Sequence, residues 1–179
     1  MPEIENRITE DLSKITASVL ALAGKRTSAV ILTGGYGRGE GGVSMREGRM
    51  SPVNDYDLFI IVDGVAFPLF WHMRSKLRTL SHQLAERIGI GVDLALFRKE
   101  SLPFLKPTLF WYETKMGHQV LLGNPRVLDA VPTVTPSQIP LAEGARLLLN
   151  RGAMLLDALG RLRQPKEHGE VTQDDTRRI

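Results

Sequence analysis

Two aspartates separated by one residue stand at the start of an apolar run, and they are the residues of this sequence best suited to chemistry. Asp55 and Asp57 lead directly into the apolar residues 58–62. Side chains two positions apart on a strand point to the same face, with Cα atoms roughly 7 Å apart. Two carboxylates held side by side at the end of a buried strand repel unless a cation lies between them. The pair therefore predicts a metal site.

A glycine pair follows an earlier apolar run and indicates an anion. Gly34 and Gly35 come directly after the apolar residues 29–32 and Thr33. Because glycine has no side chain, the backbone N–H groups around it can approach a bound anion closely. The simplest ligand that satisfies both the glycines and the aspartates is a triphosphate carrying a metal ion.

This order of residues resembles the polymerase-β-type nucleotidyltransferase superfamily, and the likeness covers roughly residues 27–123. The signature of that superfamily is an apolar strand, Gly-Gly or Gly-Ser, a spacer, and then Asp-x-Asp or Asp-x-Glu among apolar residues. The matching stretches here are Leu32-Thr33-Gly34-Gly35 and Asn54-Asp55-Tyr56-Asp57-Leu58. The superfamily also places a third carboxylate on a later strand, and Asp93 occupies that place. Residues 41–52 lengthen the usual spacer, and Gly35 stands where serine is common.

The resemblance implies an enzyme of the EC 2.7.7 type with a minimal nucleotidyltransferase domain. Such an enzyme moves a nucleoside monophosphate from an NTP to a hydroxyl group and releases pyrophosphate by a two-metal mechanism. By resemblance, Asp55 and Asp57 would bridge two ions, and Asp93 would bind one of them and act on the acceptor hydroxyl. Mg²⁺, or Mn²⁺ in its place, prefers oxygen ligands, which suits aspartates without histidine or cysteine.

The same resemblance assigns the substrates. Gly34 and Gly35 would hold the β- and γ-phosphates through backbone N–H groups, and Arg38 is a further candidate phosphate contact. ATP is the default NTP. The acceptor is a hydroxyl-bearing molecule that the sequence leaves open.

Two other functions stay open. The domain would be a catalytically degenerate binding or regulatory partner if Gly35 and the long spacer reflect loss of activity. It would be a dinucleotide-binding oxidoreductase if residues 37–42, which fit G-x-G-x-x-G, opened a helix, with Asp63 as the ribose-binding acid. Residues 43–54 lack the apolar stripe that this helix needs. A P-loop kinase is excluded because no Gly-Lys-Ser/Thr element follows the glycines.

The composition of the chain excludes several classes of site and partner. The 179 residues carry a formal net charge of +3 and contain no cysteine, which excludes disulfides, thiol chemistry and cysteine-based zinc sites. Basic residues are scattered, so long nucleic acid is disfavoured as a partner. No signal peptide or apolar run of about 18 residues is present, so we expect a cytoplasmic protein without a membrane segment.

The elements that must position these residues follow from hydrophobic periodicity. Apolar residues at a spacing of three to four predict helices, and short β-branched runs between turn residues predict strands. We expect helices over residues 4–23, 67–87, 108–116 and 141–162, and strands over residues 28–33, 54–62, 89–97 and 119–122. The long connection between the second and third strands suits a helical crossover. The fold class is therefore α/β (α+β), a small mixed sheet with flanking helices followed by a C-terminal helical segment.

The chain divides into four predicted regions. Residues 1–125 form the nucleotidyltransferase-like catalytic domain, and the proline-rich residues 126–140 form a linker. Residues 141–163 form a helix that is apolar nearly all round and therefore needs cover on more than one side. That cover is either a second copy of the chain or a helical second domain that begins here. Residues 164–179 are polar and are expected to be disordered.

Overall fold

The computed structural model describes residues 2–46 and 49–163, and the predicted disordered tail lies outside the described residues. The chain divides into two compact units, Met1–Thr133 and Val134–Ile179. All the candidate site residues belong to the first unit.

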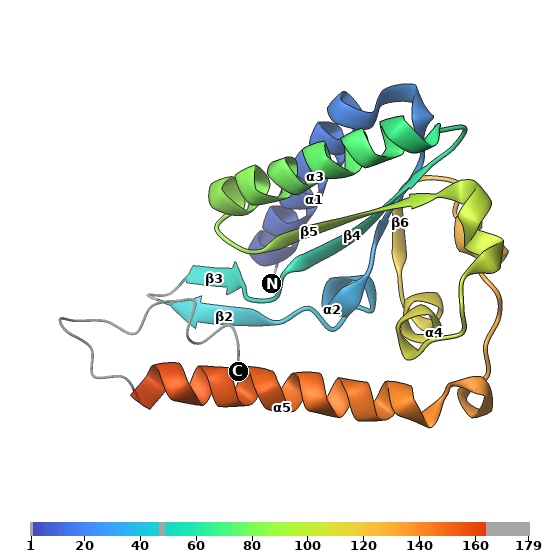
Figure 1. Cartoon of the computed structure of the whole chain (residues 1–179). Coiled ribbons are helices and arrows are strands. Elements are labelled where there is room, and N and C mark those ends of the chain that lie inside the picture. The colour runs from blue at the N-terminus through green and yellow to red at the C-terminus, as the bar shows by residue number, and fades with distance from the viewer. Residues whose placement is uncertain (1, 47–48, 164–179) are drawn as a thin grey trace. The chain divides into compact units, whose positions relative to one another are not determined.

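A four-stranded mixed sheet forms the centre of the first unit, as the sequence predicts (Figure 1). Its strands are β1 (Thr27–Leu32), β4 (Tyr56–Val62), β5 (Val92–Arg98) and β6 (Gln119–Gly123), in the spatial order β5-β4-β1-β6. β1 pairs antiparallel with both β4 and β6, whereas β4 and β5 are parallel. The crossover between these parallel strands is the predicted helix.

Two long helices cover one face of this sheet. α1 (Pro2–Ala23) and α3 (Phe67–Ile88) place their apolar stripes on the even-numbered residues of β1 and β4. Leu77 of α3 is only 1% exposed, as its position in the stripe predicts. α3 ends at Gly89, whose φ of +85° is the left-handed conformation that glycine adopts readily after a helix.

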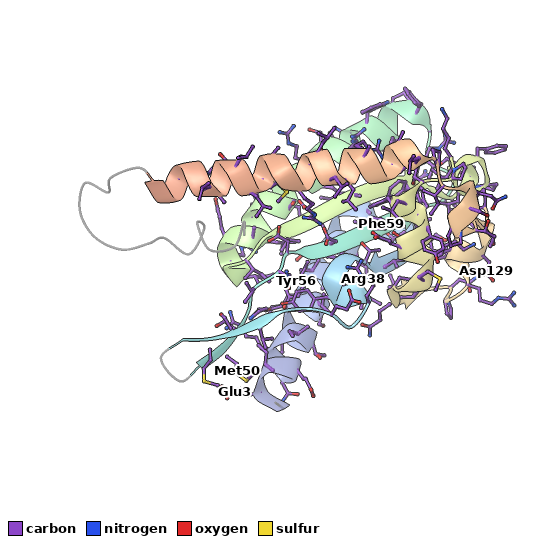
Figure 2. The ribbon with its side chains drawn as sticks, turned by 90° about the horizontal axis from the view of Figure 1, so that it is seen from below. Glu3, Arg38, Met50, Tyr56, Phe59 and Asp129 are labelled. Carbon is purple, nitrogen blue, oxygen red and sulfur yellow. The ribbon has the colours of Figure 1, made fainter. Side chains whose placement is uncertain are left out.

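A second layer covers the opposite face. It consists of the short helices η2 (Lys99–Phe104), α4 (Leu109–Met116) and η3 (Val127–Ala130). Phe59 of β4 packs against the ring of Trp111 from α4, with 5.4 Å between ring centroids, and Figure 2 shows Phe59 among the side chains of this region. The segment predicted to be a linker contributes to this layer, because its residues Val127, Leu128 and Val131 are buried.

The chain between β1 and β4 forms a helical turn and then a hairpin. The turn is α2 (Gly34–Gly37), and the hairpin pairs β2 (Val43–Arg46) with β3 (Arg49–Pro52). The hairpin occupies the long spacer between the glycine turn and the acidic residues. The dinucleotide-binding alternative is excluded, because β1 and β4 are antiparallel and no helix starts among the described residues of the range 38–54.

The second unit contains the turn η4 (Pro136–Gln138) and the helix α5 (Leu141–Arg163). Thr135 and Gln138 form a reciprocal capping box at the start of η4. Leu148 and Leu156 of α5 remain 75% and 71% exposed. None of the helices in the described ranges is long and apolar enough to cross a membrane.

Candidate functional site

Two of the predicted acidic residues lie side by side on neighbouring strands. Asp57 of β4 and Asp93 of β5 are direct partners in the parallel register. Residues paired in this way project from the same face of a sheet, and neighbouring strands lie about 4.8 Å apart. The structure therefore brings together two carboxylates that are far apart in the sequence.

The pKa of Asp57 reflects the burial of its carboxyl group and the charges around it. Burial, followed by the charges of Asp93 and Asp55, raises the pKa of Asp57 to about 6, while Arg38 opposes the rise. Asp57 thus interacts electrostatically with both of the other predicted acids. No group of three His, Cys, Asp or Glu side chains among the described residues is arranged to hold a metal ion. The three carboxylates are neighbours that do not converge on one point.

Asp55 occupies a different setting from the one the sequence predicts. β4 begins at Tyr56, so the prediction of a strand that includes residue 55 is wrong at this end. The first ladder bond runs from the Tyr56 N–H to the Gly91 carbonyl, at 2.9 Å. A Cβ atom at position 91 would lie 2.3 Å from Oδ1 of Asp55, so this carboxylate packs directly against the Gly91 backbone. The position of the Asp55 carboxylate is therefore determined by contact with the segment before β5 and not by strand alternation.

The glycine turn after β1 lies against Asp57 on the side away from β5. The Thr33 N–H donates to the Asp57 carbonyl at 2.8 Å. Gly34 has a φ of +63°, and a Cβ atom added there would lie 2.0 Å from Oδ2 of Asp57. Position 34 therefore requires glycine both for its backbone conformation and for the close approach of the carboxylate.

Gly35 and Arg38 complete the predicted set. A Cβ atom at position 35 would meet its nearest neighbour, the Glu40 carbonyl oxygen, at 3.7 Å, which is ordinary contact. Arg38 lies at the end of α2 (Figure 2), and its Nε donates to the Glu40 carboxylate at 2.8 Å. Its charge lowers the pKa of Asp57, so it acts on the site although it is paired with Glu40.

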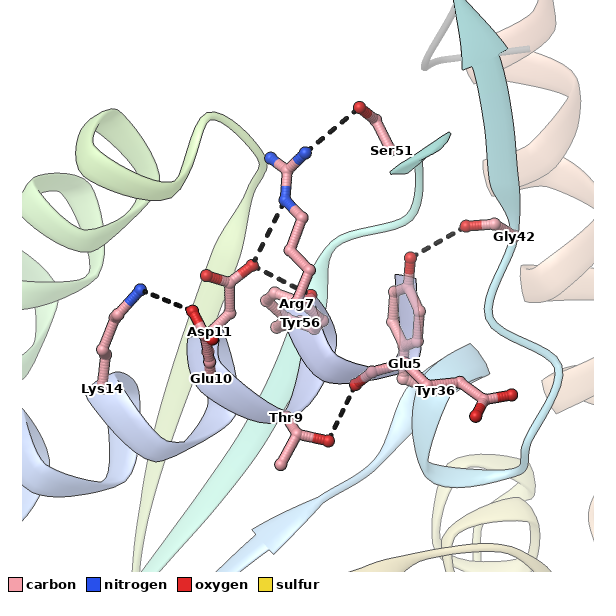
Figure 3. A network of polar contacts seen from close by, with 10 residues as sticks. All are labelled: Glu5, Arg7, Thr9, Glu10, Asp11, Lys14, Tyr36, Gly42, Ser51 and Tyr56. Atoms are coloured by element: carbon pink, nitrogen blue, oxygen red, sulfur yellow. Dashed lines mark hydrogen bonds and ion pairs between the residues drawn. The ribbon is translucent and has the colours of Figure 1, made fainter. Parts of the chain in front are cut away.

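A polar network that the sequence analysis did not identify holds the start of β4 in place (Figure 3). The Tyr56 hydroxyl donates to Oδ2 of Asp11 at 3.4 Å, and Arg7 of α1 lies 4.0 Å from the same carboxylate. Arg7 also donates to Ser51 of the hairpin at 3.2 Å. Asp11 is 6% exposed, and this burial raises the pKa of its carboxyl. The network links α1 and the hairpin to the residue between Asp55 and Asp57.

Two tyrosine rings join this network to the glycine turn. The rings of Tyr36 and Tyr56 lie 4.9 Å apart, and the Tyr36 hydroxyl donates to the Gly42 carbonyl at 2.9 Å. A Cβ atom at Gly41 would lie 2.0 Å from the Tyr36 ring, so the chain passes closely over it. Because side chains alternate along a strand, the sequence predicts that Tyr56 projects from the face opposite Asp57. No local pattern in the sequence predicts that its hydroxyl contacts Asp11.

Known proteins resemble this chain in structure and not in sequence. No family model matches the sequence, and no curated protein matches it. The chain is similar to the crystal structure of spectinomycin adenyltransferase AAD(9) from Enterococcus faecialis with ATP and spectinomycin. The identity is 15%, the coverage is 86% of this chain and 68% of that one, and the TM-score is 0.47.

Two structures of a toxin-antitoxin also resemble it. The first was solved with AMP-PNP. It is 14% identical in sequence, the match covers 82% of this chain and 97% of that chain, and the TM-score is 0.39. The second, the MntA-HepT toxin-antitoxin, is 13% identical, the match covers 84% of this chain and 98% of that chain, and the TM-score is 0.38. Likenesses at such identities and TM-scores do not show the function of this chain.

Proposed function

We propose that this chain is a metal-dependent nucleotidyltransferase that moves a nucleoside monophosphate from an NTP, ATP by default, to a hydroxyl group of an acceptor and releases pyrophosphate. One observation carries the proposal. Asp57 and Asp93 are paired on parallel strands, and the backbone of Gly34 lies directly against Asp57. A carboxylate pair beside a glycine turn suits a ligand that has both a cation and phosphates.

The acidic residues fit a divalent ion that arrives with its nucleotide. Mg²⁺ is usually bound through one or two carboxylates together with substrate phosphates, so Asp57 and Asp93 suffice as protein ligands. Asp55 would join as the third. Burial, and after it the charges of Asp93 and Asp55, raises the pKa of Asp57 to about 6, and a bound cation would relieve the repulsion between these charges. When bound, the metal would polarise the phosphate oxygens and lower the pKa of the attacking hydroxyl.

The remaining residues bind the nucleotide and move the proton. Backbone N–H groups of Gly34 and Gly35 hold the β- and γ-phosphates, and Arg38 contacts them once it leaves Glu40. The acceptor oxygen forms a bond to the α-phosphorus, and the bond from that phosphorus to the bridging oxygen breaks, so pyrophosphate leaves with the electron pair. Asp93 takes the proton from the acceptor hydroxyl.

Thermal unfolding with Mn²⁺ and ATP tests the nucleotide site. A ligand that binds only the folded state raises the melting temperature, so the two together should raise it more than either does alone. Asp57→Asn should abolish this joint shift, whereas Asp63→Asn should keep it because Asp63 pairs with Lys99 on the surface. Equal shifts in both variants would refute the site.

Release of pyrophosphate from ATP in the presence of hydroxyl compounds tests the reaction itself. We expect release that depends on Mn²⁺ and is lost in Asp93→Asn. A joint thermal shift without pyrophosphate release from any acceptor would favour the degenerate binding partner. That alternative is kept because no three acidic side chains in the described residues converge on one point.

A further inference from the structure

The helix α3 carries an excess of positive charge. It contains four Lys and Arg side chains and one acid, Glu86, so its formal charge of +3 equals that of the whole chain. No ion pair between described residues includes any of these side chains. Such a concentration of unpaired cations on one element indicates an anionic partner.

Trp71, Arg74, Arg78 and His82 form a row along one side of α3, because intervals of three and four residues keep side chains on the same side of a helix. Trp71 is 48% exposed, and the Arg74 guanidinium lies 5.0 Å from the centre of its ring. Arg74 and Arg78 are about one turn apart, and like charges at this spacing destabilise a helix. The row therefore combines an exposed aromatic ring with cations that a bound anion would stabilise.

A cavity lies beside this row. Its volume is about 860 Å³, and it is formed by residues of α3 and of the outer strand β5. All four side chains of the row line it, and Ser75 adds a hydroxyl group. Among the described residues that line it, Asp93 alone is acidic, so the two arginines outnumber the acid. The cavity is thus a basic groove with an aromatic ring in its wall.

The cavity is separate from the proposed transfer site. Leu58 of β4 and Leu94 of β5 pack in the same core cluster as Leu77 of α3. Because side chains alternate along a strand, Asp57 projects from the opposite face of the sheet, as Phe59 does. A ligand in the cavity therefore does not occupy the place assigned to the metal and the triphosphate.

We propose that the row on α3 binds a short segment of single-stranded nucleic acid, a partner that goes beyond the proposed transfer function. Proteins that bind single strands combine a cationic groove, which follows the phosphates, with aromatic rings on which bases stack. Arg74 and Arg78 bind phosphates through charge-assisted hydrogen bonds, and an unpaired base stacks on Trp71. The basic residues are scattered along the sequence, but the helix brings these three side chains together, which suits a short strand.

Two features favour a single strand over other anions. Trp71 offers a large exposed ring beside the cations, and a phosphate group alone has no use for such a ring. A membrane surface needs a continuous apolar face beside the cations, whereas Arg74, Ser75, Arg78 and His82 make this side of the helix polar.

Fluorescence anisotropy of a labelled oligo(U) about eight nucleotides long measures this binding in the full chain. The affinity should fall as the salt concentration rises, because phosphate contacts release counterions. Each lost phosphate contact should reduce the slope of log affinity against log salt by about 0.7. Oligo(dT) in the same assay separates the two sources of such a strand, since tighter binding of one of them identifies the sugar.

Matched variants locate the binding surface. Arg78→Gln should weaken the affinity by about tenfold or more and reduce the salt slope by about 0.7. Lys76→Gln removes the same charge from the same helix outside the cavity and should have a much smaller effect. Trp71→Ala should weaken the affinity about fivefold or more through lost stacking, whereas Phe104→Ala, at a ring that is 84% exposed on η2, should not. Equal effects within either pair would overturn the proposal.

Competitors identify the kind of partner. Tripolyphosphate, which has no bases, and a duplex, whose bases are paired, should each displace the labelled strand weakly. Strong displacement by either, tighter binding to vesicles of anionic lipid, or absence of a saturable anisotropy change would overturn the proposal. Saturating Mn²⁺ and ATP should leave the strand bound, and Arg78→Gln should keep the joint thermal shift with Mn²⁺ and ATP. The strand site and the transfer site are therefore tested independently.

Discussion

The carboxylate of Asp57 and the backbone of Gly34 approach so closely that no side chain fits between them. A Cβ atom at position 34 would lie 2.0 Å from Oδ2 of Asp57. The same glycine has a φ of +63°, a conformation that other residues rarely adopt. The Gly34 turn, proposed to bind phosphates, therefore packs directly against Asp57, proposed to bind the metal.

Gly34→Ala should destabilise the protein more than Gly39→Ala does. Both glycines have positive φ values, and each substitution should cost about 1–2 kcal/mol in backbone strain. Position 39 has open space around its Cα, whereas position 34 meets Asp57, so Gly34→Ala carries an additional steric penalty. Urea unfolding measures the difference. Adding Asp57→Ala should relieve part of the loss at position 34, and equal losses in the two single variants would contradict the contact.

Asp57→Asn should stabilise the metal-free protein in a pH-dependent way. Since the pKa of Asp57 rises from its usual 3.8 to about 6, the folded state holds this proton more tightly than the unfolded state. The contribution of Asp57 to stability therefore falls as the pH rises from about 4 to 6 and is constant above that. The substitution should gain about 1–3 kcal/mol at pH 8 and almost nothing at pH 4.

Urea unfolding with a chelator at both pH values measures this gain. Asp63→Asn is the control, because Asp63 is exposed and its ion pair with Lys99 lowers its pKa. That variant should show no gain at pH 8. A gain for Asp57→Asn that is the same at both pH values would show that charge is not its cause.

Leu77→Ala tests the packing of α3 on the sheet. Leu77 is 1% exposed within the core cluster, so its truncation should lower the free energy of unfolding by about 2–5 kcal/mol. Gln83→Ala, on the exposed side of the same helix, should change it by less than about 0.5 kcal/mol. Denaturant unfolding of the two variants measures this contrast, and similar small losses would place Leu77 at the surface.

Tyr56→Phe should raise the pKa of Asp11. The hydroxyl of Tyr56 donates to this buried carboxylate, and that hydrogen bond lowers a pKa that burial raises. Removing it should also lower the free energy of unfolding by about 1 kcal/mol. Tyr36→Phe is the control, because the Tyr36 hydroxyl bonds the Gly42 carbonyl instead. An NMR titration of the Asp11 carboxyl carbon would decide the matter, and an unchanged pKa in Tyr56→Phe would exclude the bond.

The types of the main elements were predictable from the sequence alone. The apolar stripe of residues 67–87 and the apolar runs that became β1 and β4 depend only on the spacing of neighbours along the chain. The candidate residues Asp55, Asp57 and Gly34 were found in the same way, since their types and order are local. In the layer on the other face, α4 was predicted over residues 108–116, whereas η2 and η3 were not, because helices of so few residues show little periodicity.

The arrangement of these residues in space was decided by the tertiary structure. Asp57 faces Asp93 because β4 and β5 pair in parallel in one particular register, which depends on how α3 packs on the sheet. Asp55 lies before β4 because its carboxylate packs against Gly91 of a distant segment. Strand register and such contacts arise from interactions between residues far apart in the chain, so local spacing cannot determine them.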